Sequence, residues 1–389
     1  MQLNTNKMSN MKKIIHLICA ARPNFMKIAP LYHALSKEDW VEPVIVHTGQ
    51  HYDINMSDSF FSDLKLPEPH IHLGAGGGSH AEQTARVMMA YEKIVQEKQP
   101  DMVVVVGDVN STIACTLAAT KVTYEMGGQD DPTNIKRAIV AHLEAGLRSF
   151  DRSMPEEVNR LATDVLADIL WTPSPDGDEH LRNEGVAENK IIRVGNIMID
   201  SLEMMRAHIE SLDECSELGL EKGKYAVLTL HRPANVDNPD ILKSLCDLLN
   251  RIAEKTTLVF PVHPRTRNNL EQTGLISRIN DNPNIRLLEP LNYVRFMNLL
   301  FNSQFALTDS GGLQEETTYL GIPCLTMRPN TERPITITEG TNQLCNIEEV
   351  EPLVNEIIEG KNKSGKRPEL WDGKTAGRVV DSIKKILDQ

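Results

Sequence analysis

Short apolar runs recur along the chain and alternate with longer segments that have helical periodicity. Several of these runs are unbroken stretches of Val, Ile and Leu, which are typical of parallel strands covered by helices on both faces. The alternation predicts an α/β fold built on open, doubly wound sheets. We expect strands at residues 14–19, 43–47, 102–106, 138–142, 191–194, 225–230, 257–262 and 305–308.

The series of strands breaks once, near Gly195-Asn196, where a charged helix at about 201–222 precedes a second series. The 389 residues also exceed the roughly 250–300 residues at which single cores usually stop growing. We therefore predict two domains, residues 11–197 and 198–377. Two long loops are expected at residues 74–79 and 127–134, where Gly, Asp and Pro are frequent.

Composition limits the classes of partner. The formal net charge is −13 at pH 7 and no basic stripe is visible, so nucleic acid is not expected as a partner. This charge is still compatible with a local basic pocket for a small phosphate ligand. The six cysteines form no C-x-x-C pair, which predicts neither a zinc site nor a disulfide framework and favours a reducing compartment, the cytoplasm.

The first apolar run follows a short basic segment at residues 11–13 and so has a weak likeness to a signal peptide. It is short, contains His16 and continues into Arg22-Pro23, which favours a buried first strand instead. No stretch approaches the roughly 18–20 apolar residues of a membrane helix. A membrane partner is therefore not expected.

Charged and polar residues follow almost every expected strand. In open α/β sheets ligands bind beyond the carboxyl ends of the strands, so these positions share one rim of their sheet. A purely structural sheet would end more often in Gly, Asn or Ser. The candidates, in chain order, are Arg22, Lys27, Asp108, Glu144, Arg148, His231, His263, Asp309 and Ser310.

Ser310-Gly311-Gly312 precede a helical start at Leu313. Gly-Gly allows the backbone to approach a ligand, and free N–H groups at a helix N-terminus favour an anion. The alternative is a tight strand–helix turn with Ser310 as the N-cap. Arg333 favours the first interpretation, because its guanidinium would complete a clamp on a diphosphate.

Two pairs of opposite charge are four residues apart, Glu144 with Arg148 and Glu156 with Arg160. On a helix each pair would share a face, and an isolated pair of this kind is usually a surface salt bridge. Both pairs, however, lie near the expected rim together with Asp108. We therefore interpret the three carboxylates as acid–base groups that shift one another's pKa values.

His231 and His263 each stand beside a basic residue at a strand end, so one is expected to meet a phosphate and the other a hydroxyl. No H-x-x-x-H or H-E-x-x-H pattern supports a metal, and none is expected. A dinucleotide cofactor is not expected either, because the first strand is followed by Arg22-Pro23-Asn24 and not by G-x-G-x-x-G.

Together these motifs resemble those of the non-hydrolysing UDP-N-acetylglucosamine 2-epimerase family. The resemblance extends from about residue 14 to residue 345, and the order and spacing of so many motifs make accident very improbable. The matching motifs are A-R-P at 21–23 with Lys27, T-G-Q-H at 48–51, G-D at 107–108, H-L-E-A-G-L-R at 142–148, P-E-E-V-N-R at 155–160, G-N at 195–196, H-R at 231–232, P-V-H at 261–263, T-D-S-G-G-L-Q-E-E at 308–316 and T-E-R-P at 331–334.

The resemblance implies a GT-B arrangement of two Rossmann-like domains, with the active site in the interdomain cleft and a C-terminal helix at 378–389 packed back on the first domain. It implies a homodimer that needs no cofactor and no metal. It also implies inversion at C2 of UDP-GlcNAc to give UDP-ManNAc, by elimination of UDP to a 2-acetamidoglucal and re-addition, in the supply of cell-surface polysaccharide precursors.

The same resemblance implies roles for individual residues. Asp108, Glu144 and Glu156 are the catalytic carboxylates, with base and acid undistinguished, and His231 assists the departure of UDP. Residues 288–296 are expected near the uracil and Glu316 at the ribose. The remaining substrate-binding candidates are Arg22, Lys27, Arg148, Arg160, His263, Ser310, Gly311, Gly312 and Arg333, several of which would hold the diphosphate.

The sequence departs from the family pattern at Asn24, where Glu is usual, at Pro233, where many members have Arg, and at Asp53. The last two argue against activation by substrate at a second site. Residues 50–53 and 76–79 are similar to relatives that act on diacetamido uronic acid nucleotides, so an epimerase of such a sugar is an alternative. A GT-B glycosyltransferase, a hydrolysing epimerase and a silent UDP-sugar-binding protein are further alternatives.

Overall fold

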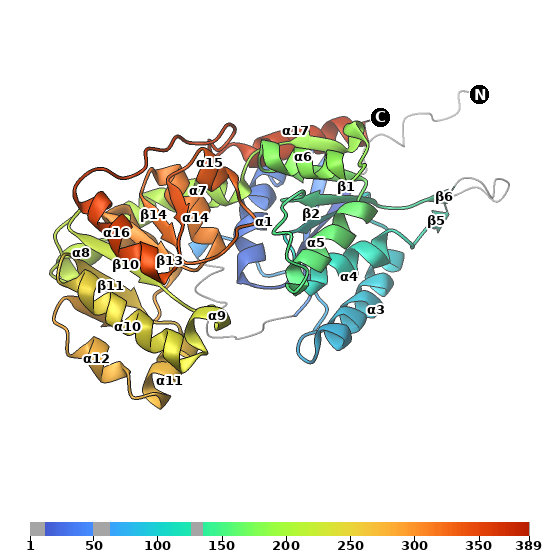
Figure 1. Cartoon of the computed structure of the whole chain (residues 1–389). Helices are drawn as coiled ribbons and strands as arrows, with labels where there is room; N and C mark the ends of the chain where they lie inside the picture. The colour runs from blue at the N-terminus through green and yellow to red at the C-terminus, as the bar shows by residue number, and fades with distance from the viewer. Residues whose placement is uncertain (1–11, 50–62, 126–134, 389) are drawn as a thin grey trace, which may run out of the picture. The chain divides into compact units, whose positions relative to one another are not determined.

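The computed structural model describes residues 12–49, 63–125 and 135–388 (Figure 1). The chain divides into two compact units, one of residues 1–204 with 369–389 and the other of residues 205–368. The chain passes from the first unit to the second within helix α7 (Ile197–Ser211), a few residues after the expected boundary. The segment from 369 onward, which includes α17 (Thr375–Leu387), belongs to the first unit.

The first unit is built on a parallel sheet whose strand order is β3-β2-β1-β4-β7-β8-β9. Along the chain, strands are added outward from β1 to β3 and then outward from β4 to β9 on the other side. The direction in which strands are added therefore reverses between β1 and β4. Such a reversal opens a crevice at the carboxyl ends of the two central strands. The strands are β1 (Lys13–Cys19), β2 (Val41–His47), β3 (Ile71–His72), β4 (Met102–Val106), β7 (Ile139–Leu143), β8 (Ile169–Thr172) and β9 (Ile191–Arg193).

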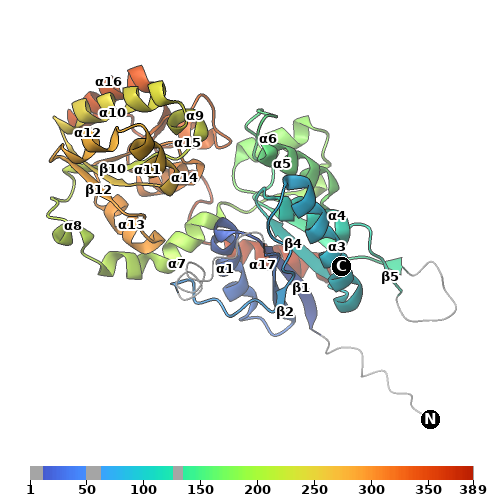
Figure 2. The ribbon, with the colours of Figure 1, turned by 90° about the horizontal axis from the view of Figure 1, so that it is seen from below.

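Helices cover both faces of this sheet, because right-handed crossovers on the two sides of a reversal place their helices on opposite faces. On one face α3, α4 and α5 pack in a row (Figure 1), and α4 lies buried between its neighbours. Helix α1 packs against α17 (Figure 2). The helices are α1 (Arg22–Leu35), α3 (His80–Lys98), α4 (Asn110–Ala119), α5 (Pro155–Leu166) and α6 (Pro175–Asn183), with a short 3-10 helix η1 (Glu188–Lys190) and a small antiparallel pair β5 (Tyr124–Glu125) and β6 (Ile135–Lys136).

The C-terminal segment is attached to the first unit by polar contacts as well as by packing. The Asp200 carboxylate of α7 accepts hydrogen bonds from the backbone N–H groups of Thr375 and Ala376, at 3.1 and 2.8 Å, and so caps the start of α17. The indole of Trp371, which is buried, donates to the carbonyl of Pro173 at 3.0 Å. These contacts satisfy donors that burial would otherwise leave without partners.

The second unit repeats the plan with the strand order β12-β11-β10-β13-β14-β15, which reverses between β10 and β13. Neighbouring strands of this sheet are parallel. The strands are β10 (Tyr225–Thr229), β11 (Thr257–Pro261), β12 (Ile285–Leu288), β13 (Phe305–Thr308), β14 (Cys324–Thr326) and β15 (Asn342–Leu344). The helices are α8 (Glu214–Glu217), α9 (Pro233–Val236), α10 (Pro239–Ala253), α11 (Pro264–Gln272), α12 (Ile276–Asn280), α13 (Tyr293–Phe301), α14 (Gly311–Leu320), α15 (Ile335–Thr338) and α16 (Ile347–Ile358).

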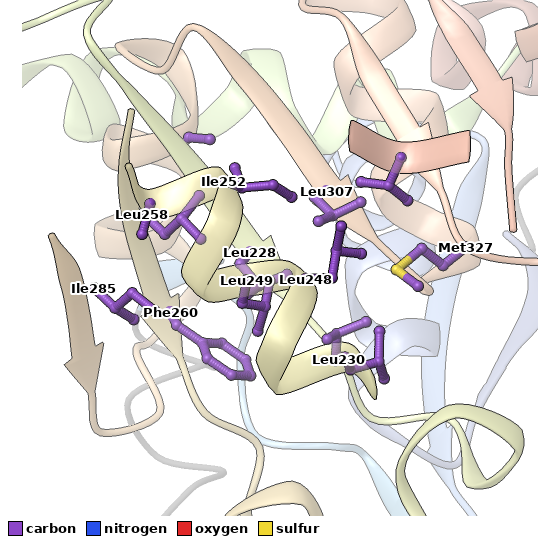
Figure 3. Packing of buried hydrophobic residues seen from close by; sticks show 14 of the residues in the cluster. Leu228, Leu230, Leu248, Leu249, Ile252, Leu258, Phe260, Ile285, Leu307 and Met327 are labelled. Atoms are coloured by element: carbon purple, nitrogen blue, oxygen red, sulfur yellow. The ribbon is translucent and has the colours of Figure 1, made fainter. Parts of the chain in front are cut away.

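Helix α10 illustrates how the pattern of residues builds the core of this unit. Asn238 caps it by accepting from the N–H groups of Asp240 and Ile241, and Pro239 occupies the first turn. Its apolar residues recur at helical spacing and pack on the strand side chains of the sheet (Figure 3). Leu248, Leu249 and Ile252 are among the buried members of this cluster.

The predicted fold class is confirmed, and each of the eight expected runs contributes a strand. The sequence pattern did not predict β3, β5, β6, β8, β12, β14 or β15, which are two to four residues long and too short to show a periodicity. The expected loop at 74–79 has no helix or strand, and the one at 127–134 lies outside the described residues. No helix in the described ranges is long and apolar enough to cross a membrane.

The expected charged helix at 201–222 is wrong. Helix α7 ends at Ser211, and α8 is a separate turn. The reason lies 90 residues further along the chain, where the buried amide of Asn298 donates to the carbonyls of Ile209 and Leu212 and accepts from the N–H of Glu214. Because these backbone groups bond to a side chain, they are not available to a continuous helix.

Candidate active site

The carboxylates of the first unit gather where its sheet reverses, at the carboxyl ends of β1 and β4. Gly107 follows β4 with a φ of +65°, and a Cβ added there would lie 2.8 Å from Lys27 Nζ and 3.4 Å from Glu144 Oε2. Only glycine therefore fits at this position. Lys27 and Glu144 form an ion pair and are both buried. The structure thus brings Lys27, Glu144 and the Gly107–Asp108 peptide together.

Helix α5 holds Asp108 from two directions. Arg160 Nε donates to Asp108 Oδ2 at 3.0 Å, and Asn159 Nδ2 donates to the Asp108 carbonyl at 2.9 Å. Arg160 is in turn paired with Glu157, which is also buried. The Asp108 side chain is 33% exposed while that of Arg160 is 3% exposed, so a buried guanidinium holds a carboxylate that is partly open to solvent. This geometry suits a group that must reach a substrate.

The interpretation of Glu144 and Arg148 as a helical pair is wrong. Residues after β7 form a turn, and Glu144 has a φ of +77°, in the left-handed region. Arg148, 1% exposed, pairs instead with Asp164 and Glu184, each at 2.7 Å. Its guanidinium lies inside the unit, which makes it a support of the site and not the substrate ligand we expected. Arg160 has the same supporting geometry.

The sequence singled out three other residues of this unit, Glu156, Arg22 and Asn24. Glu156 is exposed in the first turn of α5, after Pro155, as the sequence predicts. Arg22 begins α1, but its side chain lies outside what the structure describes. Asn24, the departure from the family pattern, accepts from Ala21 N–H and donates to the Val106 carbonyl, both at 3.0 Å. It therefore joins the loop after β1 to the end of β4.

In the second unit His231 follows β10 and pairs with Asp309, which follows β13, at 2.8 Å from Nδ1 to Oδ1. Asp309 is buried and also accepts from the N–H groups of His231 and Arg232 and from Asn235. Burial alone would raise the pKa of Asp309, but these hydrogen bonds and the His231 charge outweigh burial and lower it. The carboxylate therefore keeps Nδ1 of His231 protonated and leaves Nε2 for other contacts.

His263, at the start of α11, lies beside His231 with 5.6 Å between ring centroids. Its Nδ1 accepts from Arg265 N–H at 3.2 Å. Desolvation, then the charges of His231 and Arg265, lower the pKa of His263. A neutral ring that accepts at Nδ1 carries its proton on Nε2, so His263 has one donor to offer a ligand.

The N-terminus of α14 is formed by Gly311 and Gly312, and Ser310 occupies the N-cap position without a side-chain capping bond. The capping interpretation is therefore not supported, and the N–H groups of this first turn suit an anion. A Cβ on Gly311 would lie 2.6 Å from Glu332 Oε1 and 3.2 Å from Arg333 Nη1. Arg333 thus lies at this helix start, where it pairs with Glu315 and Glu332.

Arg328 is a candidate that sequence analysis missed. It is 4% exposed, and its Nη2 donates to Glu332. Its Nη1 would lie 3.4 Å from a Cβ added at Gly311, so the guanidinium is near the start of α14. Its Nε and Nη1 have no hydrogen-bond partner among the described residues. Buried donors of this kind usually meet a ligand or water. The only signal in the sequence was its place just after β14.

Glu316 is buried on α14 and accepts from the hydroxyl of Tyr293 at 2.7 Å. Burial raises the pKa of Glu316 from an ordinary 4.5 to about 7, and the nearby Glu315 charge acts in the same direction. Tyr293 belongs to the segment 288–296 that we expect near the uracil. The contact shows that this segment and Glu316 are neighbours within the second unit.

The sequence resemblance implies that Glu316 holds the ribose, and on that basis we expect the affinity for a UDP-sugar to rise by about tenfold between about pH 6 and pH 8. Below its pKa of about 7 the carboxyl holds a proton, which must leave before both oxygens can accept from ribose hydroxyls. Because the pKa of Glu316 is higher in the folded protein than in the unfolded one, its bound proton stabilises the fold fully below about pH 4.5. This contribution to the free energy of unfolding is lost as the pH rises through about 7. Titration calorimetry should show the pH dependence in the wild type and a flatter one in Glu316→Gln. Equal slopes would contradict this role.

Sequence analysis also missed the supporting residues of both units. Asp309 stood in a recognised motif but had no role assigned to it, and the same is true of His142, Glu157 and Asn159. Asp164 stood in no motif. Their functions depend on partners far away in the chain, and no local pattern reveals them. Among the parts of the chain that are described, no three His, Cys, Asp or Glu side chains are grouped as metal ligands.

Comparison with known proteins agrees with this geometry. A family model for UDP-N-acetylglucosamine 2-epimerase matches residues 33–384. The UDP-N-acetylglucosamine 2-epimerase of Methanocaldococcus jannaschii is 38% identical over 382 residues, 94% of this chain and 97% of the relative. The UDP-2,3-diacetamido-2,3-dideoxy-D-glucuronate 2-epimerase of Pseudomonas aeruginosa is 38% identical over 336 residues, 85% of this chain and 88% of the relative. A crystal structure of the M. jannaschii enzyme in complex with UDP-GlcNAc and UDP matches with a TM-score of 0.82 at 37% identity, over 96% of this chain and 99% of that one.

Proposed function

Because the chain belongs to the UDP-N-acetylglucosamine 2-epimerase family, we propose that it interconverts UDP-GlcNAc and UDP-ManNAc without hydrolysis, in the supply of cell-surface polysaccharide precursors. The observation that supports this proposal is the convergence of Lys27 and Glu144 at Gly107, the residue that precedes Asp108 in the chain. Inversion at a carbon needs a base on one face and an acid on the other. A site with an anchored, partly exposed carboxylate beside a buried carboxylate–ammonium pair provides both.

The reaction follows from these groups. A carboxylate takes the proton from C2 of the sugar, the C1–O bond breaks, and UDP leaves with the bonding electrons to give a 2-acetamidoglucal. A proton is then delivered to the other face of C2, and the phosphate oxygen of UDP adds back at C1. Asp108, Glu144 and Glu156 supply the base and the acid, and His231, oriented by Asp309, stabilises the departing UDP.

The nucleotide is held mainly by the second unit in this proposal. The N–H groups of Ser310, Gly311 and Gly312 bind the diphosphate, and Arg333 adds charge beside them. Glu316 accepts from the ribose, and the segment around Tyr293 lies near the uracil. Lys27 of the first unit, which faces Glu144, and His263 complete the set of substrate ligands.

Incubation with UDP-GlcNAc in D₂O tests the proposal. Proton NMR should show UDP-ManNAc appearing and deuterium accumulating at C2, without added metal or cofactor. Free ManNAc would instead identify a hydrolysing enzyme. The absence of any exchange would contradict the proposal and direct the next assay to a modified sugar or to glycosyl transfer.

A second candidate substrate is a UDP-2,3-diacetamido uronic acid. The Pseudomonas aeruginosa relative that acts on such a sugar is as similar to this chain, at 38% identity, as the relatives named for UDP-GlcNAc. The segment 50–53 that suggested this sugar lies outside the described residues. The same D₂O assay with the diacetamido uronate as substrate discriminates the two candidates by their rates of C2 exchange.

Helix α5 supports the proposal of a homodimer. Its buried residues are polar or charged, namely Glu157, Arg160, Thr163 and Asp164. Two of its valines face outward, Val158 at 52% and Val165 at 71% exposed, while Leu161 and Leu166 are half-buried. Met89 of the same row of helices is 55% exposed. An amphipathic helix with its apolar face outward is destabilising unless another surface covers it, and a second copy of the chain is the occupant we assign.

We expect the double variant Val158→Lys/Val165→Lys to be monomeric and the wild type to be a dimer. Two lysines on this face would be desolvated at the interface without partners. Size-exclusion chromatography with light scattering measures the mass of each form. Ile358→Lys, at an exposed apolar position of the second unit, is the control that should stay dimeric. A dimeric double variant would exclude α5 from the interface.

The proposed compartment is the cytoplasm. All six cysteines are buried and none forms a disulfide within the described structure. Such thiols are typical of a reducing compartment. Fractionation of cells that express a tagged protein would test this assignment, and recovery from a secreted or envelope fraction would overturn it.

A further inference from the structure

A buried group of charges lies next to the Gly107–Asp108 peptide, and the sequence motifs assigned no role to its histidine or its aspartate. It consists of His142 on β7, Asp164 on α5 and Arg148, with the exposed Glu184 as a further partner of Arg148, and we call it the His142 network. His142 and Asp164 are 0% and 2% exposed. Burying charges is costly, so a buried network of this size needs both full pairing and a reason to be kept.

The hydrogen bonds of His142 determine its charge. Nε2 lies 2.8 Å from the carbonyl oxygen of Gly107, and Nδ1 lies 2.6 Å from Asp164 Oδ1. A carbonyl oxygen only accepts, so Nε2 must carry a hydrogen. Whether Nδ1 carries one as well depends on the ionisation of Asp164.

Asp164 is ionised. Its second oxygen accepts from Gly146 N–H at 3.1 Å and pairs with Arg148 Nη1 at 2.7 Å. A backbone N–H and a guanidinium both donate to this oxygen, so the charged form of the carboxylate is stabilised independently of His142. An ionised carboxylate is an acceptor, so Nδ1 of His142 is a donor too. His142 is therefore an imidazolium with two N–H groups.

The acceptor at Nε2 is the carbonyl of the peptide bond that joins Gly107 to Asp108. The hydrogen bond from His142 fixes the plane of the peptide from which Asp108 projects. Arg160 fixes the Asp108 side chain, and Asn159 fixes the Asp108 carbonyl. A charged donor makes a stronger hydrogen bond than a neutral one. We propose that His142 is a positioning residue with two N–H donors, which the Asp164 carboxylate holds in place and which aims Asp108 through the Gly107 carbonyl.

The inference rests on the proposed function of Asp108, and it can be tested in two independent ways. The first uses no activity. In protein labelled with ¹⁵N-histidine, the His142 signals are assigned by their loss in His142→Gln, and at about pH 7 both ring nitrogens should have the shifts of protonated N–H groups. A neutral ring at pH 7 would overturn the inference.

The second test measures kinetics of Asp164→Asn, which keeps the shape of the side chain and removes its charge. We expect kcat to fall on the order of 100-fold, because a small misplacement of a reacting group has about that effect, and KM to change by less than about twofold. Rates are expressed per folded first unit, measured by the fluorescence of Trp40, Trp171 and Trp371, which all belong to that unit, so that loss of folded protein does not count. Asp164→Glu, which restores the charge, should recover part of kcat.

Asp168→Asn is the matched control. Asp168 follows the same helix and also pairs with an arginine, Arg137, at 2.6 Å, but it does not contact the carboxylates of the site. Its kcat should equal that of the wild type. An unchanged kcat in Asp164→Asn, with Asp108→Asn impaired, would overturn the inference alone. An unimpaired Asp108→Asn would instead overturn the proposed site.

Discussion

Asp108→Asn should lower the turnover of UDP-GlcNAc by about 10²–10⁴-fold, the range that a positioned acid or base usually contributes. The amide keeps an oxygen for the hydrogen bond from Arg160 Nε, so the loop after β4 should hold its shape. What is lost is the ability to accept a proton. Because the nucleotide is bound by groups of the second unit in our proposal, affinity for UDP should change by less than about twofold.

Proton NMR in D₂O measures both the rate of UDP-ManNAc formation and the rate of C2 deuteration, and calorimetry measures the affinity for UDP. Glu144→Gln should be similarly impaired, since it also removes the partner of the buried Lys27 ammonium. Glu42→Gln, at an exposed position of β2, removes a charge far from the motifs and should turn over normally. If Asp108→Asn and Glu144→Gln both turned over at the wild-type rate, the site would lie elsewhere.

Gly146→Ala should destabilise the first unit by about 3–4 kcal/mol, near the upper end of what single substitutions do. Gly146 has a φ of +80°, and its added Cβ would lie 2.4 Å from the Gly177 carbonyl oxygen and 2.9 Å from Gly177 Cα. These are backbone atoms at the start of α6, and they cannot move away by rotation about a side-chain bond. The strain of a left-handed alanine adds about 1–2 kcal/mol.

Tryptophan fluorescence reports selectively on this substitution, because Trp40, Trp171 and Trp371 all belong to the first unit. A loss of 3–4 kcal/mol should lower the midpoint of thermal unfolding by about 10 °C in a unit of this size. Gly185→Ala is the matched control, since Gly185 has a φ of +85° but no atom within 4 Å of the added Cβ. It should show the backbone strain alone. Equal shifts in the two variants would contradict the proposed clash.

Much of the site was predictable because strand ends are visible in the sequence. Asp108, His231 and Ser310 each follow an apolar run directly, and the carboxyl ends of parallel strands meet at one edge of a sheet. The residues that hold these groups were not predictable. Asp164 looks like any polar residue on a helix, and its contact with His142 depends on the packing of α5 beside β7.

The sequence by itself determined the α/β class, eight of the strands and the residue types at the rim, because burial on both faces and the chemistry of a site restrict which residues can stand there. The tertiary structure alone decided the partners. Lys27 and Glu144 meet although 117 residues separate them, Arg148 turns inward to Asp164 and not to Glu144, and Asn298 ends α7 from another part of the chain. Such contacts depend on how whole elements pack, and burial then requires that each polar group finds whichever partner the packing has brought near.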